Sequence, residues 1–365
     1  MDTRGFTSQP LRWFVDYGCR DDYGTTLDTT SAWAGLHYFC SRETEASLVW
    51  GDGLGTVIRN MAQALAADGV EIRTSSLVHR IEQSGGTATV EYVDLRDNSS
   101  RVVRARKVIF AAPHHTARHI ISGYAQQERV HDAECGVEGC LNFTYAPWAV
   151  ANVFLKRPPP TPWNWEQMAY RPNATGFSRQ GLGYVFSPSE IQRWSASWWS
   201  PMSWPWQWKW NGGAAAQRSE TVLTAYFVLS ESVGNLPHEW LNKSWEDWRD
   251  DVLDSLRMTI PTIDELSYKV DVRVLAHAMN RPVPGFLWGP RSPRKLAQRP
   301  FGAVHFAHSD HSGLSLFEEA VTREYGHEKL HDFRNISNGS LVITEGFRAA
   351  TEVAAEVADE VTISN

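Results

Sequence analysis

Apolar residues recur at helical spacing over residues 56–68, and this stripe predicts an amphipathic helix. Its apolar positions are Val57, Met61, Ala64, Leu65 and Ala67. Gly69 follows at the place where a helix commonly ends. Short apolar runs then predict a series of strands, with polar residues 97–100 marking a hairpin between the last two. The predicted strands are 70–74, 77–83, 87–95 and 101–110. Residues 114–122 begin another predicted helix.

A second set of apolar segments predicts a second sheet. Residues 141–157 and 221–230 have the apolar content of buried strands, and residues 270–275 alternate as a half-buried strand does. Residues 237–257 place tryptophan and leucine near one face and predict a helix. Strands followed by helices in both halves indicate an α/β fold class.

Two stretches interrupt this pattern. Residues 194–216 hold six tryptophans between Trp198 and Trp210, without helical or strand periodicity, and predict a loop insertion. Residues 321–344 are polar and aperiodic, and they separate two segments that would read continuously without them. We expect this second stretch to be an insertion as well.

Composition narrows the class of function. The net charge is −7 and no basic run is present, so a nucleic acid is not an expected partner. No apolar stretch approaches the roughly 18 residues that span a bilayer, and residues 1–5 begin no apolar signal segment. These features favour a cytoplasmic protein with a small-molecule substrate, whose oligomeric state is left open. The four cysteines are scattered, which predicts free thiols.

Residues 304–320 combine a strand, a polar loop and a helical pattern. Small and apolar residues run to Ala307, and Asp310 and Gly313 lie in the loop. The residues at helical spacing after it are Leu314, Leu316, Phe317 and Ala320. A strand, a tight loop and a helix N-terminus form a site for a negatively polarised group, because the free N–H groups and the helix dipole point out of the turn.

This segment resembles the C-terminal flavin loop of FAD-dependent, amine-oxidase-like oxidoreductases. Other segments resemble further motifs of that family: a glycine-containing helix, the strand that lies against the adenine, the strand after it, and two segments of a bacterial-type branch. They are residues 47–69, 70–81, 107–113, 31–39 and 277–285. The resemblance covers most of residues 1–320.

The resemblance implies a fold and a domain organisation. The expected fold is α/β, with an incomplete Rossmann-like FAD-binding domain and a mixed-sheet substrate domain. The FAD-binding domain is expected to comprise residues 44–125 and 300–361. The substrate domain is expected to comprise residues 1–43 and 126–299.

The resemblance also implies site residues and FAD as the cofactor. Val78 and Ala112 are expected to frame the adenine, and Asp310 to orient the ribityl or phosphate end. Gly313, Leu314 and Ser315 are expected to stabilise negative charge at the pyrimidine edge of the reduced flavin. His308 and Ser312 belong to the same loop. Tyr23, Trp33 and Tyr38 are candidates to wall the substrate cavity.

Simpler roles exist for several of these residues. Asp310 is also a typical cap or turn acid, and the two serines are ordinary caps. His305, His308, Asp310 and His311 also suggest a metal site. That site is not favoured, because His305 and His308 would point to opposite faces of a strand. No metal is therefore expected.

The expected reaction is oxidation of a small organic substrate by hydride transfer to the flavin. No catalytic residue is assigned. Amine oxidases of the monoamine type carry a lysine near the flavin on a substrate-domain strand. The comparable strand here is residues 146–156, which has Val150 and Asn152 at its centre and Lys156 only at its far end. This difference argues against classical amine oxidation more than against flavin binding.

The glycine fingerprint of such flavoproteins, a strand followed by GxGxxG and a helix, does not precede residue 30. Residues 51–55 are the nearest imitation, but the third glycine arrives one residue early. The alternative to an enzyme is therefore a truncated, non-catalytic remnant or fragment of such a flavoprotein.

Overall fold

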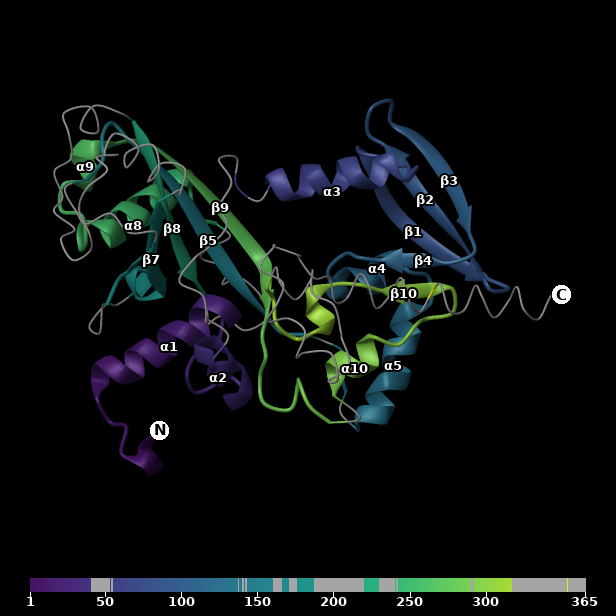
Figure 1. The fold of residues 1–365 in the computed structure, drawn as a ribbon, viewed down its shortest axis with the longest axis horizontal. Helices are drawn as coiled ribbons and strands as arrows, with labels where there is room; N and C mark the ends of the chain where they lie inside the picture. Colours follow the sequence, from purple (N-terminus) through teal and green to yellow (C-terminus); the bar gives the residue numbers. More distant parts are fainter. Residues whose placement is uncertain are drawn as a thin grey trace, which may run out of the picture. The chain divides into compact units, whose positions relative to one another are not determined.

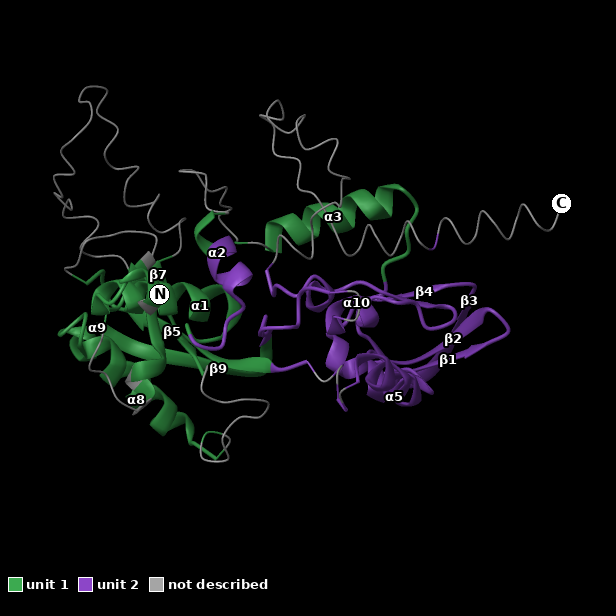
Figure 2. Ribbon diagram, turned by 90° about the horizontal axis from the view of Figure 1, so that it is seen from below, with its two compact units in different colours: residues 1–27, 38–72, 145–278 green, residues 28–37, 73–144, 279–365 purple. Residues whose placement is uncertain are grey.

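A computed structural model gives the fold of the chain (Figure 1). It describes residues 1–40, 53, 55–136, 138–139, 141, 143–159, 166–170, 176–186, 220–229, 240, 242–289, 292–316 and 353. The chain divides into two compact units (Figure 2). Unit 1 comprises residues 1–27, 38–72 and 145–278, and unit 2 comprises residues 28–37, 73–144 and 279–365. Both units combine helices with sheets, so the predicted α/β class is confirmed.

Unit 1 is built on a five-stranded sheet with the order β6-β7-β8-β5-β9. Its strands are β5 (Tyr145–Leu155), β6 (Glu166–Met168), β7 (Gly181–Phe186), β8 (Thr221–Val228) and β9 (Ser267–Asn280, to residue 278 in this unit). Its helices are η1 (Asp2–Arg4), α1 (Gln9–Tyr23), α3 (Gly55–Ala67), η3 (Gly176–Gln180), α8 (Trp245–Arg257) and α9 (Ile263–Leu266). Helix α2 (Ala32–Cys40) contributes residues to both units.

The core of unit 1 lies between one face of this sheet and helix α8. Alternate residues of β5 are fully buried, from Ala149 to Leu155, and they join Trp248, Val252 and Leu256 of α8 in one cluster. The helix begins at a capping box, in which the Ser244 side chain accepts a hydrogen bond from the N–H of Asp247 at 3.1 Å. This box fixes the first turn of the helix that covers the sheet.

Unit 2 contains two smaller sheets. Strands β1 (Ser76–Ser84), β2 (Thr87–Asp94) and β3 (Ser99–Ala105) form an antiparallel sheet, whereas β4 (Val108–Phe110) and β10 (Val304–Phe306) pair in parallel. The helices are η2 (His114–Thr116), α4 (Ala117–Ile120), α5 (Tyr124–Cys135), α10 (Pro293–Ala297) and η6 (Ser309–His311). The core contains Ile81, Phe110, Tyr124, Val304 and Phe306.

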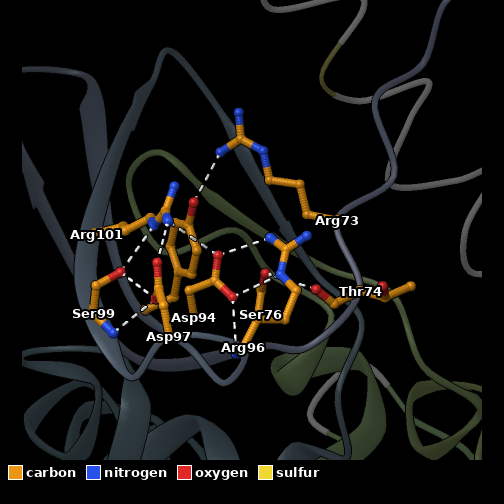
Figure 3. A network of polar contacts seen from close by, with 9 residues as sticks. Arg73, Thr74, Ser76, Asp94, Arg96, Asp97, Ser99 and Arg101 are labelled. Atoms are coloured by element: carbon orange, nitrogen blue, oxygen red, sulfur yellow. Dashed lines mark hydrogen bonds and ion pairs between the residues drawn. The ribbon is translucent and has the colours of Figure 1, made fainter.

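An ion-pair network around Asp94 closes the β2–β3 hairpin (Figure 3). Asp94 is buried, and its two carboxylate oxygens accept hydrogen bonds from Nε and Nη2 of Arg96 at 2.8 and 2.7 Å. These bonds favour the charged carboxylate and lower the pKa of Asp94 to about 2. Asp97 accepts hydrogen bonds from the N–H and hydroxyl of Ser99 at 3.0 and 2.6 Å. The network confirms the predicted hairpin and fixes its turn.

The structure corrects four predicted elements. Residues 70–75 form no strand, because Ser75 turns the chain through the left-handed region at φ 56° and leaves Val70 and Ile72 exposed. The strand predicted at 101–110 is two strands, since β3 pairs with β2 and β4 pairs with β10. Residues 114–122 contain only the short helices η2 and α4. Helix α8 begins after Ser244 rather than near residue 237.

The prediction of free thiols was correct for Cys19 and Cys40 and wrong for Cys135, which is disulfide-bonded. Cys135 ends helix α5, where Gly136 reverses the chain at φ 75°. Its partner lies outside the described residues, as do the predicted insertions at 194–216 and 321–344. Within the described part of the chain, no helix is long and apolar enough to cross a membrane.

Candidate functional site

Several predicted cofactor residues gather in unit 2, where the parallel strands β4 and β10 end. The register pairs Val304 with Val108 and Phe306 with Phe110, and the N–H of Ala307 donates to the Phe110 carbonyl at 3.0 Å. Both carboxyl ends therefore lie at one edge, where ligands commonly bind in parallel sheets. Residues 111–114 leave this edge after β4, and residues 307–316 leave it after β10.

Asp310 joins these two segments. Its side chain is 2% exposed, and Oδ2 accepts a hydrogen bond from the backbone N–H of His114 at 2.9 Å. His114 is the first residue of η2, so the carboxylate caps the start of that helical segment. This bond links two segments that are 196 residues apart, whereas the cap or turn role expected from the sequence was local to the loop. A contact between Asp310 and a cofactor stays a prediction.

His114 and His311 form a buried imidazole pair behind Asp310. Nδ1 of His114 lies 3.1 Å from Nε2 of His311, and both residues are at most 1% exposed. The His114 ring stacks on Phe143 at 4.7 Å and meets Tyr124 and Phe306 at 5.8 and 6.1 Å. Burial in this apolar setting lowers the pKa of His114 to about 4. Nε2 of His114 is buried and meets no hydrogen-bond partner in the described part of unit 2.

His308 lies at the start of the loop. Its Nδ1 accepts the backbone N–H of Asp310 at 3.1 Å and lies 3.3 Å from Oδ2 of the same residue. Strand β10 ends at Phe306, so His305 and His308 do not share one strand as the sequence suggested. The described residues include no group of three His, Cys, Asp or Glu side chains that could hold a metal ion.

The residues after η6 form a tight turn. The Ser312 hydroxyl donates to the Ser309 carbonyl at 2.8 Å and accepts the N–H of Leu314 at 3.3 Å. Gly313 has a φ of 87°, and Leu314 is buried. Residues 312–316 are turn and coil rather than helix, so the predicted helix does not begin at Leu314. The rest of that predicted helix lies beyond the described residues.

Gly313 is required for both its conformation and its lack of a side chain. A Cβ here would lie 2.4 Å from Leu287 Cδ2 and 3.2 Å from Arg294 Cδ. We expect Gly313→Ala to lower the free energy of unfolding by about 2 kcal/mol, from left-handed strain plus overpacking. Urea unfolding measures the loss. Gly86→Ala is the matched control, because its φ is 81° but its Cβ would meet open space. Equal losses for both variants would contradict the close packing at Gly313.

The two predicted adenine residues pack against one cluster. Val78 on β1 and Ala112 after β4 are half-buried, and both contact the core that contains Phe110 and Phe306. The structure therefore places them in one core region of unit 2. Contact with an adenine stays a prediction.

The predicted substrate residues are divided between the two units. Tyr23 is fully buried in unit 1, where Tyr38 is 6% exposed and its hydroxyl donates to Asp21 at 3.2 Å. Trp33 belongs to unit 2, where it stacks on His37 at 5.0 Å and meets Trp288 edge-on at 5.3 Å. A substrate role for these three residues stays a prediction.

Strand β5 has Asn152 at its centre, where amine oxidases of the monoamine type were expected to carry a lysine. Asn152 Oδ1 accepts a hydrogen bond from the Thr224 hydroxyl at 2.8 Å. Lys156 lies beyond the strand, and its Nζ donates to the Glu265 carbonyl at 3.0 Å. Both side chains have structural partners in unit 1.

Sequence reasoning missed His114 and Asn280 as members of the site, and it considered His311 only as a possible metal ligand. His114 and Asp310 are 196 residues apart, and only the parallel pairing of β4 with β10 brings them together. Asn280 donates from Nδ2 to the Asp310 carbonyl at 3.2 Å and from its backbone N–H to the Ser315 hydroxyl at 2.6 Å. The one available signal was the position of His114, directly after the small-residue turn 111–113.

Known proteins resemble this chain in part. Residues 17–189 match the model of the family described as flavin containing amine oxidoreductase. No curated protein matches the chain. A solved structure of a putative protoporphyrinogen oxidase from Exiguobacterium sp. 255-15 has a TM-score of 0.46 and 14% identity, covering 76% of this chain and 50% of that one. Cyclohexylamine oxidase from Brevibacterium oxydans IH-35A has a TM-score of 0.46 and 15% identity, covering 85% of this chain and 62% of that one.

This chain therefore spans about half to three-fifths of the length of those two proteins. The loop at residues 304–316 lies outside the segment that matches the family model. The match over residues 17–189 confirms the resemblance, indicated by the sequence motifs, to the flavin-containing amine oxidoreductases.

Proposed function

We propose that this chain binds FAD and oxidises a small organic substrate. The observation that carries the proposal is the junction of Asp310 with His114 at the shared edge of β4 and β10, in a chain related to flavin-containing oxidoreductases. When bound, FAD accepts a hydride from the substrate. The protein supplies binding and orientation.

The residues at this edge fit a ligand that has both hydrogen-bond donors and acceptors. Nε2 of His114 and Oδ1 of Asn280 are buried polar atoms that no described residue satisfies. Gly313 keeps the loop free of a side chain at its tightest point. An FAD molecule offers hydroxyl and N–H donors and many oxygen acceptors, so it matches this set.

Each residue then has a task. Asp310 orients the ribityl or phosphate end, and the tight turn of Gly313, Leu314 and Ser315 lies at the pyrimidine edge. Val78 and Ala112 frame the adenine with apolar contacts. His114 does not change its protonation state near pH 7, because burial keeps its ring neutral.

The test is a visible absorption spectrum of the purified protein, followed by titration of ligand-free protein with FAD. We expect saturable binding of one FAD per chain. Asp310→Asn keeps an acceptor for the His114 N–H but removes the charge, and we expect it to weaken FAD binding about tenfold. Asp68→Asn, at an exposed acid, is the control. Absence of saturable FAD binding by the wild-type protein would overturn the proposal.

A further inference from the structure

Three successive carbonyl groups of the loop are held by side chains from outside it. The Asp310 carbonyl accepts from Asn280 Nδ2 at 3.2 Å, the His311 carbonyl from Gln298 Nε2 at 2.8 Å, and the Ser312 carbonyl from Arg294 Nη1 at 3.1 Å. Arg294 and Gln298 are four residues apart at helix α10 and its C-cap, so they project on one side. All of these residues belong to unit 2. The loop conformation is therefore set before any ligand arrives.

Asn280 differs from the other two donors because it also binds the far end of the loop. Its backbone N–H donates to the Ser315 hydroxyl at 2.6 Å, and that hydroxyl lies 3.4 Å from the Asn280 carbonyl. Asn280 thus contacts both Asp310 and Ser315, two residues that the sequence assigned to cofactor binding. The residue is 1% exposed.

The orientation of the Asn280 amide is fixed by chemistry. The Asp310 carbonyl can only accept a hydrogen bond, so the NH₂ group must face it and the amide oxygen must face away. That oxygen is buried and meets no donor among the residues that the structure describes. A buried acceptor without a donor is costly, and native proteins rarely retain one without a use.

We propose that Asn280 is a further residue of this site that contacts the flavin. Its amide nitrogen holds the loop, and its amide oxygen accepts a hydrogen bond from a donor at the ribityl–isoalloxazine end of the cofactor. Two groups there have the required chemistry: a ribityl hydroxyl and the imide N–H of the ring. The inference rests on the proposed function, because it assumes that this loop binds that end of FAD.

The test compares Asn280→Leu with Gln298→Leu. Both variants remove one donor from a loop carbonyl, but only Asn280→Leu also removes the buried acceptor. We expect Asn280→Leu to weaken FAD binding about tenfold, a change of about 1.4 kcal/mol, and Gln298→Leu to weaken it less. In the ligand-free protein the order is reversed: Gln298→Leu lowers the urea midpoint more, because Asn280→Leu also removes an unsatisfied group. A purely structural role for Asn280 would lower both quantities together.

Modified ligands test the same contact in the wild-type protein, whether or not a variant folds. The probes are FAD methylated at the imide nitrogen and FAD deoxygenated along the ribityl chain. We expect one of them to bind the wild-type protein about tenfold more weakly than FAD does, which identifies the donor. Asn280→Leu should not distinguish that probe from FAD.

Two results would overturn the inference, and a third would overturn the proposed function. Equal binding of FAD by wild type and Asn280→Leu would overturn it, as would equal binding of FAD and both probes by the wild type. A wild-type protein that binds no FAD would instead overturn the proposed function itself, so the two failures are distinguishable.

Discussion

Acidification from pH 7 to pH 4 is expected to lower the free energy of unfolding of unit 2 by about 3 kcal/mol through His114 alone. Burial lowers the pKa of this imidazole from 6.5 to about 4 in the folded state. Between pH 4 and pH 6.5 the unfolded chain therefore binds a proton on this imidazole, whereas the folded chain does not. Stability from the neutral ring is intact above pH 6.5 and is lost as the pH falls toward 4.

The surroundings of His114 explain why its neutral form is preferred. Nδ1 shares a proton with Nε2 of His311, an arrangement that requires one of the two nitrogens to be unprotonated. The aromatic rings of Tyr124, Phe143 and Phe306 lie around the imidazole. Asp310 is the nearby group that favours the charged ring, whereas Arg118, His115 and His308 disfavour it. Desolvation is the largest of these effects.

Urea unfolding between pH 7 and pH 4 measures this dependence. His114→Gln should flatten the pH profile, because glutamine does not titrate. His119→Gln is the matched control, since His119 is exposed on the adjoining helix α4 and should leave the profile unchanged. Identical profiles for the wild type and His114→Gln would show that other groups cause the acid sensitivity.

Elements whose signal is local were predictable from the sequence. The apolar stripe at 56–68 is helix α3, and the apolar run at 221–230 contains β8. The run toward Ala307 contains β10. In each case the pattern reflects either helical propensity or burial on both faces, and both are properties of consecutive residues. The strand predicted at 70–74 failed because its apolar residues are exposed in the fold.

Only one of the segments that form the candidate site could be predicted from the sequence. Asp310, Ser312, Gly313 and Ser315 were found because they lie in one continuous segment with turn chemistry. Asn280 lies in the segment 277–285, whose resemblance to the family assigned no role to this side chain. Its importance comes from the Asp310 carbonyl, 30 residues away, and from an amide oxygen whose burial depends on tertiary packing. Hydrophobic pattern carries no information about such contacts.

Phe227→Ala is expected to have the largest effect on stability, about 3–5 kcal/mol. Phe227 is 1% exposed on β8, and its ring stacks on Phe177 at 4.4 Å. Its neighbours across the sheet are Ala149 on β5 and Gly181 on β7. These two directly paired residues are small, so neither has a side chain that could fill the space left by the ring. The cavity term should therefore add fully to the lost transfer free energy.

Chemical unfolding of Phe227→Ala, followed by tryptophan fluorescence and far-UV circular dichroism, measures the loss. Phe6→Ala is the matched control, because Phe6 is 52% exposed and should change stability by less than about 0.5 kcal/mol. Phe227 lies in the core of unit 1, whereas Asn280 and Asp310 lie in unit 2. At a temperature where the variant remains folded, its FAD affinity should therefore match that of the wild type. A loss below about 1 kcal/mol would mean that Phe177 and Trp248 collapse into the space, and that the core between α8 and the sheet is less rigid than its packing indicates.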